Sequence, residues 1–253
     1  MYKILANTIF LGKDVHFLPE CHSTNDIALQ LIKNRQAAEG TLVITENQTK
    51  GKGQRGNVWQ TAAGQNLTFS LILSPKFMDI SEQFYLNMMV SNSIRSLLVE
   101  YLPELKVKWP NDLVIPDCGK IGGVLIENVF GAKGWEYAVV GVGINVNQIT
   151  GLPDRAISMK SMTGSVFELK ELLQLLVTQI EQGYLKLKKR NLEVIRLEFE
   201  RHMFQFDQWK SYQTEDGRFK GKITGVSKEG HLLLETDKGE KNQFGIKELQ
   251  FLW

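Results

Sequence analysis

The stretch "QTKGKGQRGNVW", Gln48 to Trp59, decides the fold class because it carries a familiar glycine pattern in unfamiliar surroundings. Gly51, Gly53 and Gly56 spell G-x-G-x-x-G, the fingerprint of a loop that binds a dinucleotide between a strand and a helix. A β-rich run, TLVITEN, precedes this loop, but a polar segment and a second β-rich run, NLTFSLIL, follow it. The Gly-Lys-Ser/Thr that ends a P-loop is also missing. The loop therefore predicts a connection between two strands and argues against a Rossmann fold.

The same loop has the composition of an anion-binding segment. Its glycines allow backbone N–H groups to approach a ligand closely, and Lys50, Lys52 and Arg55 add positive charge. A mobile basic loop that binds no ligand would have the same composition. The loop by itself leaves both interpretations open.

The composition is that of an ordinary globular protein. The chain has 253 residues, with 43% hydrophobic and 23% charged, which predicts one large domain or one domain plus a small one. The net charge of +2 provides no general attraction for nucleic acid or membranes, so an anion site must be local. Two cysteines without C-x-x-C spacing and scattered histidines argue against a zinc site or a disulfide scaffold. Without a signal-like or membrane-spanning apolar run, the expected location is the cytoplasm.

Hydrophobic spacing predicts the elements on both sides of the loop. An N-terminal strand, a turn at Gly12 and an extended segment ending at Pro19 come first. Apolar residues in NLTFSLIL alternate, which is typical of a half-buried strand. Three short strands are expected between Leu105 and Phe130, broken by Pro110 and Gly119, and an apolar strand follows from 134. Helices are expected over three segments, the first with a Ser23/Asp26 capping box: 23–36, 81–101 and about 167–201.

The character of the chain changes after Phe206. The remaining segment has no helical period and consists of short β-rich runs separated by Asp-Gly, Glu-Gly and Lys-Gly turns. This pattern predicts a small antiparallel barrel. We therefore expect a main domain over residues 1–206 and a β domain over residues 207–253.

A second cluster of polar residues, "KWPND", lies at Lys108 to Asp112. Pro110 cannot donate a ladder hydrogen bond, so it interrupts a strand here. Lys108 is a mobile point charge suited to a phosphate or a carboxylate. Asp112 either holds Mg²⁺ or caps a turn, and the residues do not distinguish the two.

The segment "GKIGGVLIE", Gly119 to Glu127, follows closely. Gly122 and Gly123 inside an apolar strand indicate close approach of a ligand or of a packed helix. Lys120 is a second candidate cation.

Taken in order, the motifs resemble those of biotin protein ligases. They are STN at 23–25, GKGQRGNVW at 51–59, KWPND, GKIGGVLIE, and GVGIN at 141–145, and the resemblance covers essentially the whole chain. It implies an α+β fold: a mixed β-sheet with flanking helices, as in a class II synthetase-like ligase core, followed by a small SH3-like β-barrel. It is the short form of the family that the chain resembles, because only 22 residues precede Ser23, too few for an N-terminal winged helix that binds DNA.

The resemblance implies an ATP-dependent ligase. Such enzymes make biotinyl-5′-AMP from biotin and ATP with Mg²⁺, release pyrophosphate, and pass biotin to one lysine of a biotin carboxyl carrier protein, such as that of acetyl-CoA carboxylase. No tightly bound metal, no nucleic acid and no membrane partner are expected. Homodimers joined at sheet edges occur in the family, and a homodimer is left open here.

The resemblance also implies roles for individual residues. Lys108 is the catalytic cation that bridges the biotin carboxylate and the ATP α-phosphate, and Asp112 is the candidate metal ligand. The polar groups for the biotin ureido ring are Ser23, Thr24 and Gln48. The full set of implied biotin-binding residues is Ser23, Thr24, Asn25, Gln48, Gly51, Lys52, Gly53, Gln54, Gly122 and Gly123. The implied nucleotide-binding residues are Arg55, Trp59, Asn111, Lys120 and Asn145.

The glycine loop departs from the family pattern G-R-G-R-x-G. Lys52 replaces the first arginine and keeps its charge without the bidentate fork, and Gln54 replaces the second and loses the charge. Backbone N–H groups are therefore expected to matter more here than these side chains. The nearest alternative is a lipoate or octanoyl transferase of the same fold class, but its R-R-x-x-G-G-G segment is missing.

Overall fold

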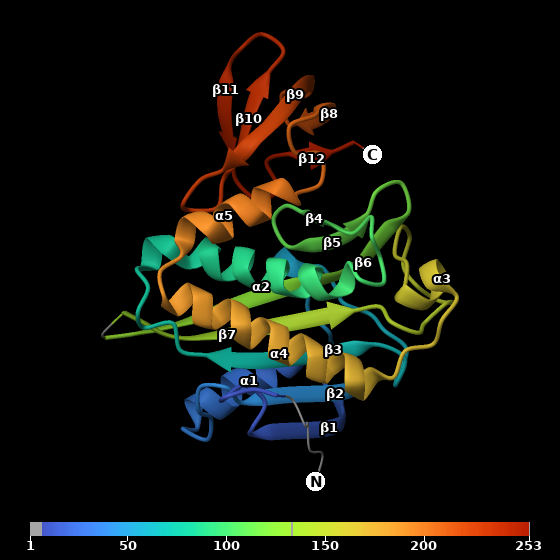
Figure 1. The fold of residues 1–253 in the computed structure, drawn as a ribbon, viewed down its shortest axis with the longest axis vertical. Helices are drawn as coiled ribbons and strands as arrows, with labels where there is room; N and C mark the ends of the chain where they lie inside the picture. The colour runs from blue at the N-terminus through green and yellow to red at the C-terminus, as the bar shows by residue number, and fades with distance from the viewer. Residues whose placement is uncertain (1–6, 133, 253) are drawn as a thin grey trace.

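The computed structural model describes residues 7–132 and 134–252 and contains two β-sheets (Figure 1). The first is seven-stranded, in the order β1-β2-β3-β7-β6-β5-β4, and is mixed because β1 and β2 run parallel while their neighbours pair antiparallel. The second is five-stranded and antiparallel, in the order β11-β10-β9-β8-β12. These sheets confirm the predicted mixed sheet followed by a small β unit.

The bounds of the elements follow the sequence patterns closely. The strands of the large sheet are β1 (Val15–Cys21), β2 (Leu42–Gln48), β3 (Leu67–Leu73), β4 (Lys106–Lys108), β5 (Asp112–Ile115), β6 (Gly119–Gly131) and β7 (Gly134–Ile144). Those of the small sheet are β8 (Trp209–Thr214), β9 (Gly217–Val226), β10 (Leu232–Thr236), β11 (Lys241–Phe244) and β12 (Gln250–Phe251). The helices are α1 (Thr24–Lys33), α2 (Gln83–Leu98), α3 (Met159–Thr163), α4 (Leu169–Lys188) and α5 (Leu192–Arg201), with 3₁₀ turns η1 (Gln54–Gly56) and η2 (Ile80–Glu82). No helix in this described part is both long and apolar enough to cross a membrane.

Helices cover both faces of the large sheet, and strand β3 shows the consequence. All its residues are buried, so the expectation of a half-buried strand was wrong. Phe69 and its alternating neighbours belong to the main core with α2 and α4, while Ile72 packs with Ala28 of α1. Ser70 on the α1 side is buried as well and bonds to polar groups of that helix. Alternation in the sequence therefore marked an apolar face and a hydrogen-bonded polar face.

Two further expectations need correction. The long C-terminal helix is two helices, because Arg190 adopts a left-handed φ of 62° between α4 and α5. Its guanidinium binds the carboxylate of Glu82 in η2 through two hydrogen bonds of 2.6 and 2.8 Å, and no glycine or proline marked this break.

The extended segment near the N-terminus continues past Pro19 to Cys21, since β1 is an edge strand that tolerates proline. Most of the N-terminal strand expected before Gly12 lies outside the described residues.

The small sheet shares one hydrophobic core with the large one. Tyr212 and Phe251 belong to the same buried cluster as Val107 beside the KWPND motif. The buried indole Nε1 of Trp109 donates a hydrogen bond of 2.9 Å to the backbone oxygen of Gly230, in the turn between β9 and β10. The small sheet is therefore held directly against the motif that carries Lys108.

We expect Trp109→Phe to destabilise the fold, because it leaves the buried oxygen of Gly230 without its donor. The lost bond should lower the melting temperature by on the order of 5 °C. Trp209→Phe is the matched control, since that indole in the small sheet is 44% exposed. Thermal unfolding followed by circular dichroism measures both, and equal melting temperatures for the two variants would contradict the coupling.

Candidate functional site

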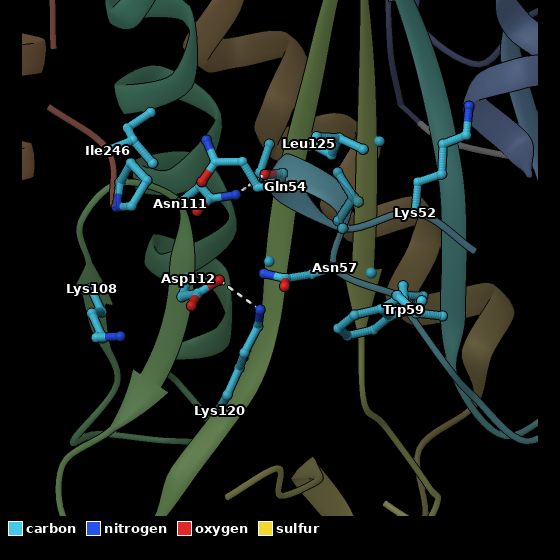
Figure 2. Close-up of a pocket in the computed structure, with 18 of the residues that line it drawn as sticks. Lys52, Gln54, Asn57, Trp59, Lys108, Asn111, Asp112, Lys120, Leu125 and Ile246 are labelled. Carbon is cyan, nitrogen blue, oxygen red and sulfur yellow. Dashed lines mark hydrogen bonds and ion pairs between the residues drawn. The ribbon is translucent and has the colours of Figure 1, made fainter. Parts of the chain in front are cut away.

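A cavity of about 620 Å³ lies between the large sheet, the glycine loop and the edge of the small sheet (Figure 2). It joins segments that are far apart in the sequence: the start of α1, residues 52–59, the KWPND motif, β6, β7 and the chain end near β12. Of the predicted site residues it is lined by Ser23, Thr24, Asn25, Gln48, Lys52, Gly53, Gln54, Trp59, Lys108, Asn111, Asp112, Lys120 and Gly123.

The glycine loop folds into a narrow hairpin at the cavity. The amide of Gly53 donates to the oxygen of Asn57 at 2.7 Å, and the amide of Trp59 donates to the oxygen of Gly51 at 3.0 Å. The Trp59 indole lies against Gly143 of β7, where an added Cβ would be 2.4 Å from the ring. Gly143 therefore makes room for the indole, which anchors the end of the loop on the sheet.

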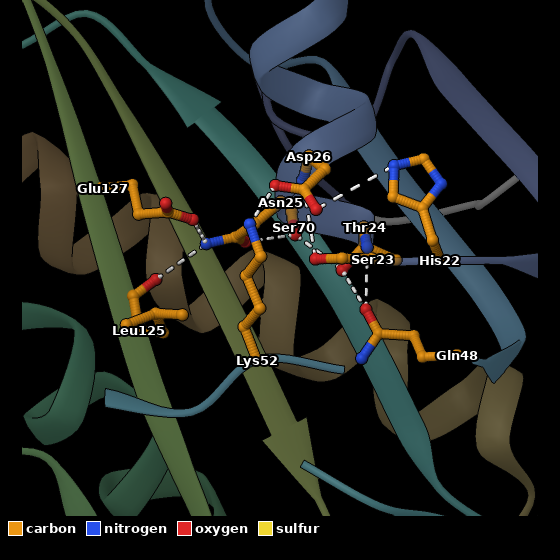
Figure 3. A network of polar contacts seen from close by, with 10 residues as sticks. All are labelled: His22, Ser23, Thr24, Asn25, Asp26, Gln48, Lys52, Ser70, Leu125 and Glu127. Carbon is orange, nitrogen blue, oxygen red and sulfur yellow. Dashed lines mark hydrogen bonds and ion pairs between the residues drawn. The ribbon is translucent and has the colours of Figure 1, made fainter. Parts of the chain in front are cut away.

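A polar network forms one end of the cavity (Figure 3). The Gln48 side-chain oxygen accepts from the backbone amide of Thr24 at 2.7 Å and from its hydroxyl at 3.2 Å. The Ser70 hydroxyl lies 2.7 Å from the Thr24 hydroxyl and 2.6 Å from the Asn25 amide oxygen. The Ser23 hydroxyl accepts from the amide of Asp26 and caps α1, the accepting half of the predicted capping box. These groups are oriented by one another at the cavity wall.

Asn25 is the most constrained member of this network. Its Nδ2 donates to the Glu127 carboxylate at 2.7 Å, and it is 3% exposed. A Cβ on Gly141 would lie 2.4 Å from its side-chain oxygen, so the side chain fits only against glycine. This arrangement gives Asn25 a structural role, the holding of α1 on the sheet, in addition to its place in the wall.

The ammonium of Lys52 is bound to α1. It forms an ion pair with the carboxylate of Asp26, which His22 also approaches at 3.9 Å (Figure 3). The hydrogen bond that Lys52 donates to Asp26 is the main cause that raises the pKa of Lys52 above the ordinary lysine value. The lysine that replaces the family arginine therefore fastens the glycine loop to the helix that carries Thr24.

Two further lysines face the other end of the cavity. Lys120 Nζ pairs with the Asp112 carboxylate at 2.6 Å (Figure 2). Lys108 lies on β4 directly opposite Asp112 on β5. Burial lowers the pKa of Lys108 below the ordinary lysine value, although the charge of Asp112 opposes this shift. This end of the cavity is therefore suited to bind anions.

The loop before α3 adds residues that the sequence did not reveal. The amide of Lys120 donates to the oxygen of Arg155 at 2.7 Å, and the amide of Ile157 donates to the oxygen of Lys120 at 2.9 Å. These bonds bring Asp154 and Arg155 into the cavity wall. The segment LPDRAIS carries no motif, so only the tertiary fold could identify it.

Some predicted residues lie elsewhere. Gly51 and Gly122 are not among the described lining residues, and both allow close backbone packing. A Cβ added at Gly51 would lie 2.2 Å from the backbone oxygen of Trp59. A Cβ added at Gly122 would lie 2.5 Å from the backbone oxygen of Gly143. The buried Asn145 also lies outside the lining, with its Nδ2 donating to the oxygen of Ile157 at 3.1 Å. Direct ligand contacts by these three residues stay predictions. The Arg55 side chain is outside the described part of the structure.

The candidate metal ligand is already engaged, since Asp112 pairs with Lys120. Within residues 7–132 and 134–252 no group of three or more His, Cys, Asp or Glu side chains is placed to hold a metal ion. The described carboxylates in the cavity wall are Asp112 and Asp154. One or two carboxylates can complete the coordination of an Mg²⁺ ion that is already bound to phosphates, but cannot form a closed site for it.

The chain matches a family model described as the biotin/lipoate A/B protein ligase family over residues 18–145. It is 29% identical to the bifunctional ligase/repressor BirA of Bacillus subtilis over 240 residues, covering 92% of this chain and 73% of that protein. It is 24% identical to a biotin–acetyl-CoA-carboxylase ligase of Paracoccus denitrificans, covering 88% of this chain and 95% of that one.

Among solved structures, the biotin protein ligase from Aquifex aeolicus in complex with biotin and ATP is similar, with a TM-score of 0.76 and 28% identity over 95% of this chain and 100% of that one. The fold, the order of the motifs and the family match agree. The chain therefore belongs to the biotin/lipoate A/B protein ligase family.

Proposed function

We propose that this protein activates biotin with ATP to form biotinyl-5′-AMP and transfers biotin to a lysine of a biotin carboxyl carrier protein. One observation carries the proposal: a single cavity has an oriented polar network at one end and clustered lysines at the other. Biotin has matching ends, a polar ureido ring and a carboxylate. The similar enzymes described as biotin ligases support the same assignment.

The polar network is suited to the ureido ring. That ring offers N–H donors and one carbonyl acceptor, and a buried polar ligand must find partners for each. Thr24 and Gln48 are fixed relative to each other by two hydrogen bonds, with Ser23 beside them at the start of α1. A network that is already oriented loses little conformational freedom when biotin binds.

The lysines are suited to the chemical step. A carboxylate oxygen of biotin attacks the α-phosphorus of ATP, the bond to the β-phosphate oxygen breaks, and pyrophosphate leaves with the electron pair. Lys108 and Lys120 offset the repulsion between the two anions and stabilise charge that develops at phosphorus. Mg²⁺ arrives with ATP, and Asp112 and Asp154 are the carboxylates that would complete its coordination.

The glycine loop protects the product of this step. Biotinyl-AMP is a mixed anhydride that water can hydrolyse, so the cavity must exclude water until the carrier arrives. The Trp59 anchor and the Lys52–Asp26 pair hold the loop over the cavity at both of its ends. The carrier lysine then attacks the biotinyl carbonyl and AMP leaves, so no nucleophile from this chain is needed.

We further propose that residues 1–206 form the catalytic unit and residues 207–253 the accessory unit, and that the enzyme acts in the cytoplasm. The change from the large to the small sheet near Phe206 supports the division. The free thiols of Cys21 and Cys118 are compatible with a reducing compartment.

Incubation with biotin, ATP, Mg²⁺ and a biotin carrier domain tests the function. We expect the carrier to gain the mass of one biotinyl group, and to gain nothing when ATP is omitted. Lipoate in place of biotin is the matched substrate control, because the polar network has no partner on a dithiolane ring. A carrier that gains lipoyl but not biotinyl would overturn the assignment in favour of the lipoate branch of the family.

Lys108→Met should separate catalysis from stability. The rate of pyrophosphate release should fall by on the order of 10²–10³ because the anions lose a cation. The melting temperature should stay equal or rise, since burial disfavours the charged form of Lys108 and the variant removes that cost. Lys106→Met, a change on the same strand outside the described cavity lining, is the control. An unchanged rate in Lys108→Met would refute the catalytic role.

The pH dependence of adenylate formation follows from the lowered pKa of Lys108. Only the protonated lysine can bridge two anions, so kcat/KM, which reports the pKa of the free enzyme, should fall as pH rises through that pKa. Because the pKa is lowered, this fall should begin below the ordinary lysine value of 10.5. Pyrophosphate release measured from neutral to alkaline pH shows this limb, which should disappear from the residual rate of Lys108→Met. A wild-type profile that is flat up to the ordinary lysine value would contradict the prediction.

A further inference from the structure

The ammonium of Lys108 meets an aromatic ring of the small sheet. Its Nζ lies 5.1 Å from the ring centroid of Phe251, on the terminal strand β12. Phe251 also lines the cavity, together with Ile246, Leu249 and Gln250 from the same segment. The end of the chain therefore forms part of the wall around the catalytic lysine.

The Phe251 ring is held in place by contacts within the small sheet and with Phe204. Phe251 is 8% exposed and pairs with Tyr212 of β8 in the strand register. The Tyr212 ring contacts it edge-on at 5.5 Å and 79°, and the Phe204 ring lies 6.2 Å away. An aromatic ring packed on two sides has one orientation, so it can define where the ammonium lies.

Three of the lysines that line the cavity, Lys52, Lys108 and Lys120, differ in the contacts shown for their ammonium groups. Lys52 and Lys120 are paired with the carboxylates of Asp26 and Asp112. A substrate anion must compete with such a carboxylate before it can use the lysine. An aromatic face attracts the charge through its quadrupole without an anionic oxygen. The contact with the Phe251 ring therefore adds a restraint on the Lys108 ammonium that does not itself compete with phosphate or carboxylate.

We propose that Phe251 is a positioning residue for Lys108, whose ring holds the ammonium where biotin carboxylate and ATP α-phosphate meet. This inference rests on the proposed function of Lys108. It makes the small sheet a contributor to adenylate formation through one side chain. The bond of 2.9 Å from Trp109 to Gly230 fixes the small sheet against the KWPND motif, and the bond of 3.0 Å from the Val226 amide to Glu200 fixes it against α5.

Burial increases the importance of this contact. The charged form of Lys108 is disfavoured by burial, attracted by Asp112 and repelled by Lys120 and Arg155. A cation–π contact is worth more when the cation is desolvated. Loss of the ring would remove this restraint on the ammonium near the reacting groups.

Phe251→Leu and Phe251→Tyr test the role of the ring. Leucine keeps apolar packing but removes the π face, and it should lower the first-order rate of pyrophosphate release on the order of tenfold. The KM for biotin should hardly change, because the ureido network lies at the other end of the cavity. Tyrosine keeps the π face and should retain a rate within about twofold of the wild type.

Phe219→Leu is the matched control in the same sheet. Its ring stacks with Tyr212 at 6.0 Å and Phe244 at 5.9 Å but is not among the described lining residues. It should lower the melting temperature about as much as Phe251→Leu while leaving the rate near the wild type. Equal losses of rate in both leucine variants would show a general effect of the small sheet and overturn the proposal.

The Lys108→Met background separates this inference from the function on which it rests. If the ring acts through Lys108, Phe251→Leu should have no further effect on the residual rate of Lys108→Met. If Lys108→Met is slow but Phe251→Leu is as fast as the wild type, the positioning role alone is overturned. If Lys108→Met is itself as fast as the wild type, the role of Lys108 fails and that of Phe251 fails with it.

Discussion

The close packing of side chains against two glycines of β7 is the constraint on which the site depends. Gly141 and Gly143 lie two residues apart, so they present the same face of the strand. The Asn25 amide occupies the space beside the first, and the Trp59 indole occupies the space beside the second. An added Cβ would come within 2.4 Å of either side chain. The absence of two methyl groups thus allows both α1 and the glycine loop to rest directly on the central sheet.

This packing holds the two paired arms of the loop at one wall of the cavity, where Trp59 is hydrogen-bonded to Gly51 and Lys52 lies opposite Val58. Lys52 continues the attachment at one end through Asp26, on the helix that Asn25 holds. Trp59 provides it at the other end. Lys52 and Gln54 stand where the family pattern has arginines. The loop can cover an acyl-adenylate without ligand contacts from these two side chains, because its attachment to the sheet and to α1 already orders its backbone.

Charge is distributed unevenly around the same cavity. The polar network at Thr24 and Gln48 is neutral, whereas Lys108 and Lys120 gather near Asp112. This separation suits a substrate with a neutral polar head and an anionic tail. The desolvated Lys108 lies between the sheets, where the small β unit supplies an aromatic neighbour and a backbone acceptor for the adjacent Trp109.

Much of this protein is determined by local sequence. The alternation and apolar periods predicted the main strands and helices, and the glycine loop followed by a strand excluded a Rossmann fold. The motifs also identified most of the described cavity wall, because Thr24, Gln48, Lys108 and Lys120 lie in short segments whose residue types are unusual for plain strands or helices. Local patterns determine such features because hydrogen-bonding and packing periods are properties of neighbouring residues.

Only the tertiary structure decided the rest. The left-handed turn at Arg190 depends on Glu82 from a distant turn, and Arg155 reaches the cavity through backbone bonds to Lys120. Phe251 resembles any other core residue in the sequence, yet it lies over the ammonium of Lys108. These features arise from contacts between segments that are far apart along the chain, and such contacts exist only after the sheets have packed together.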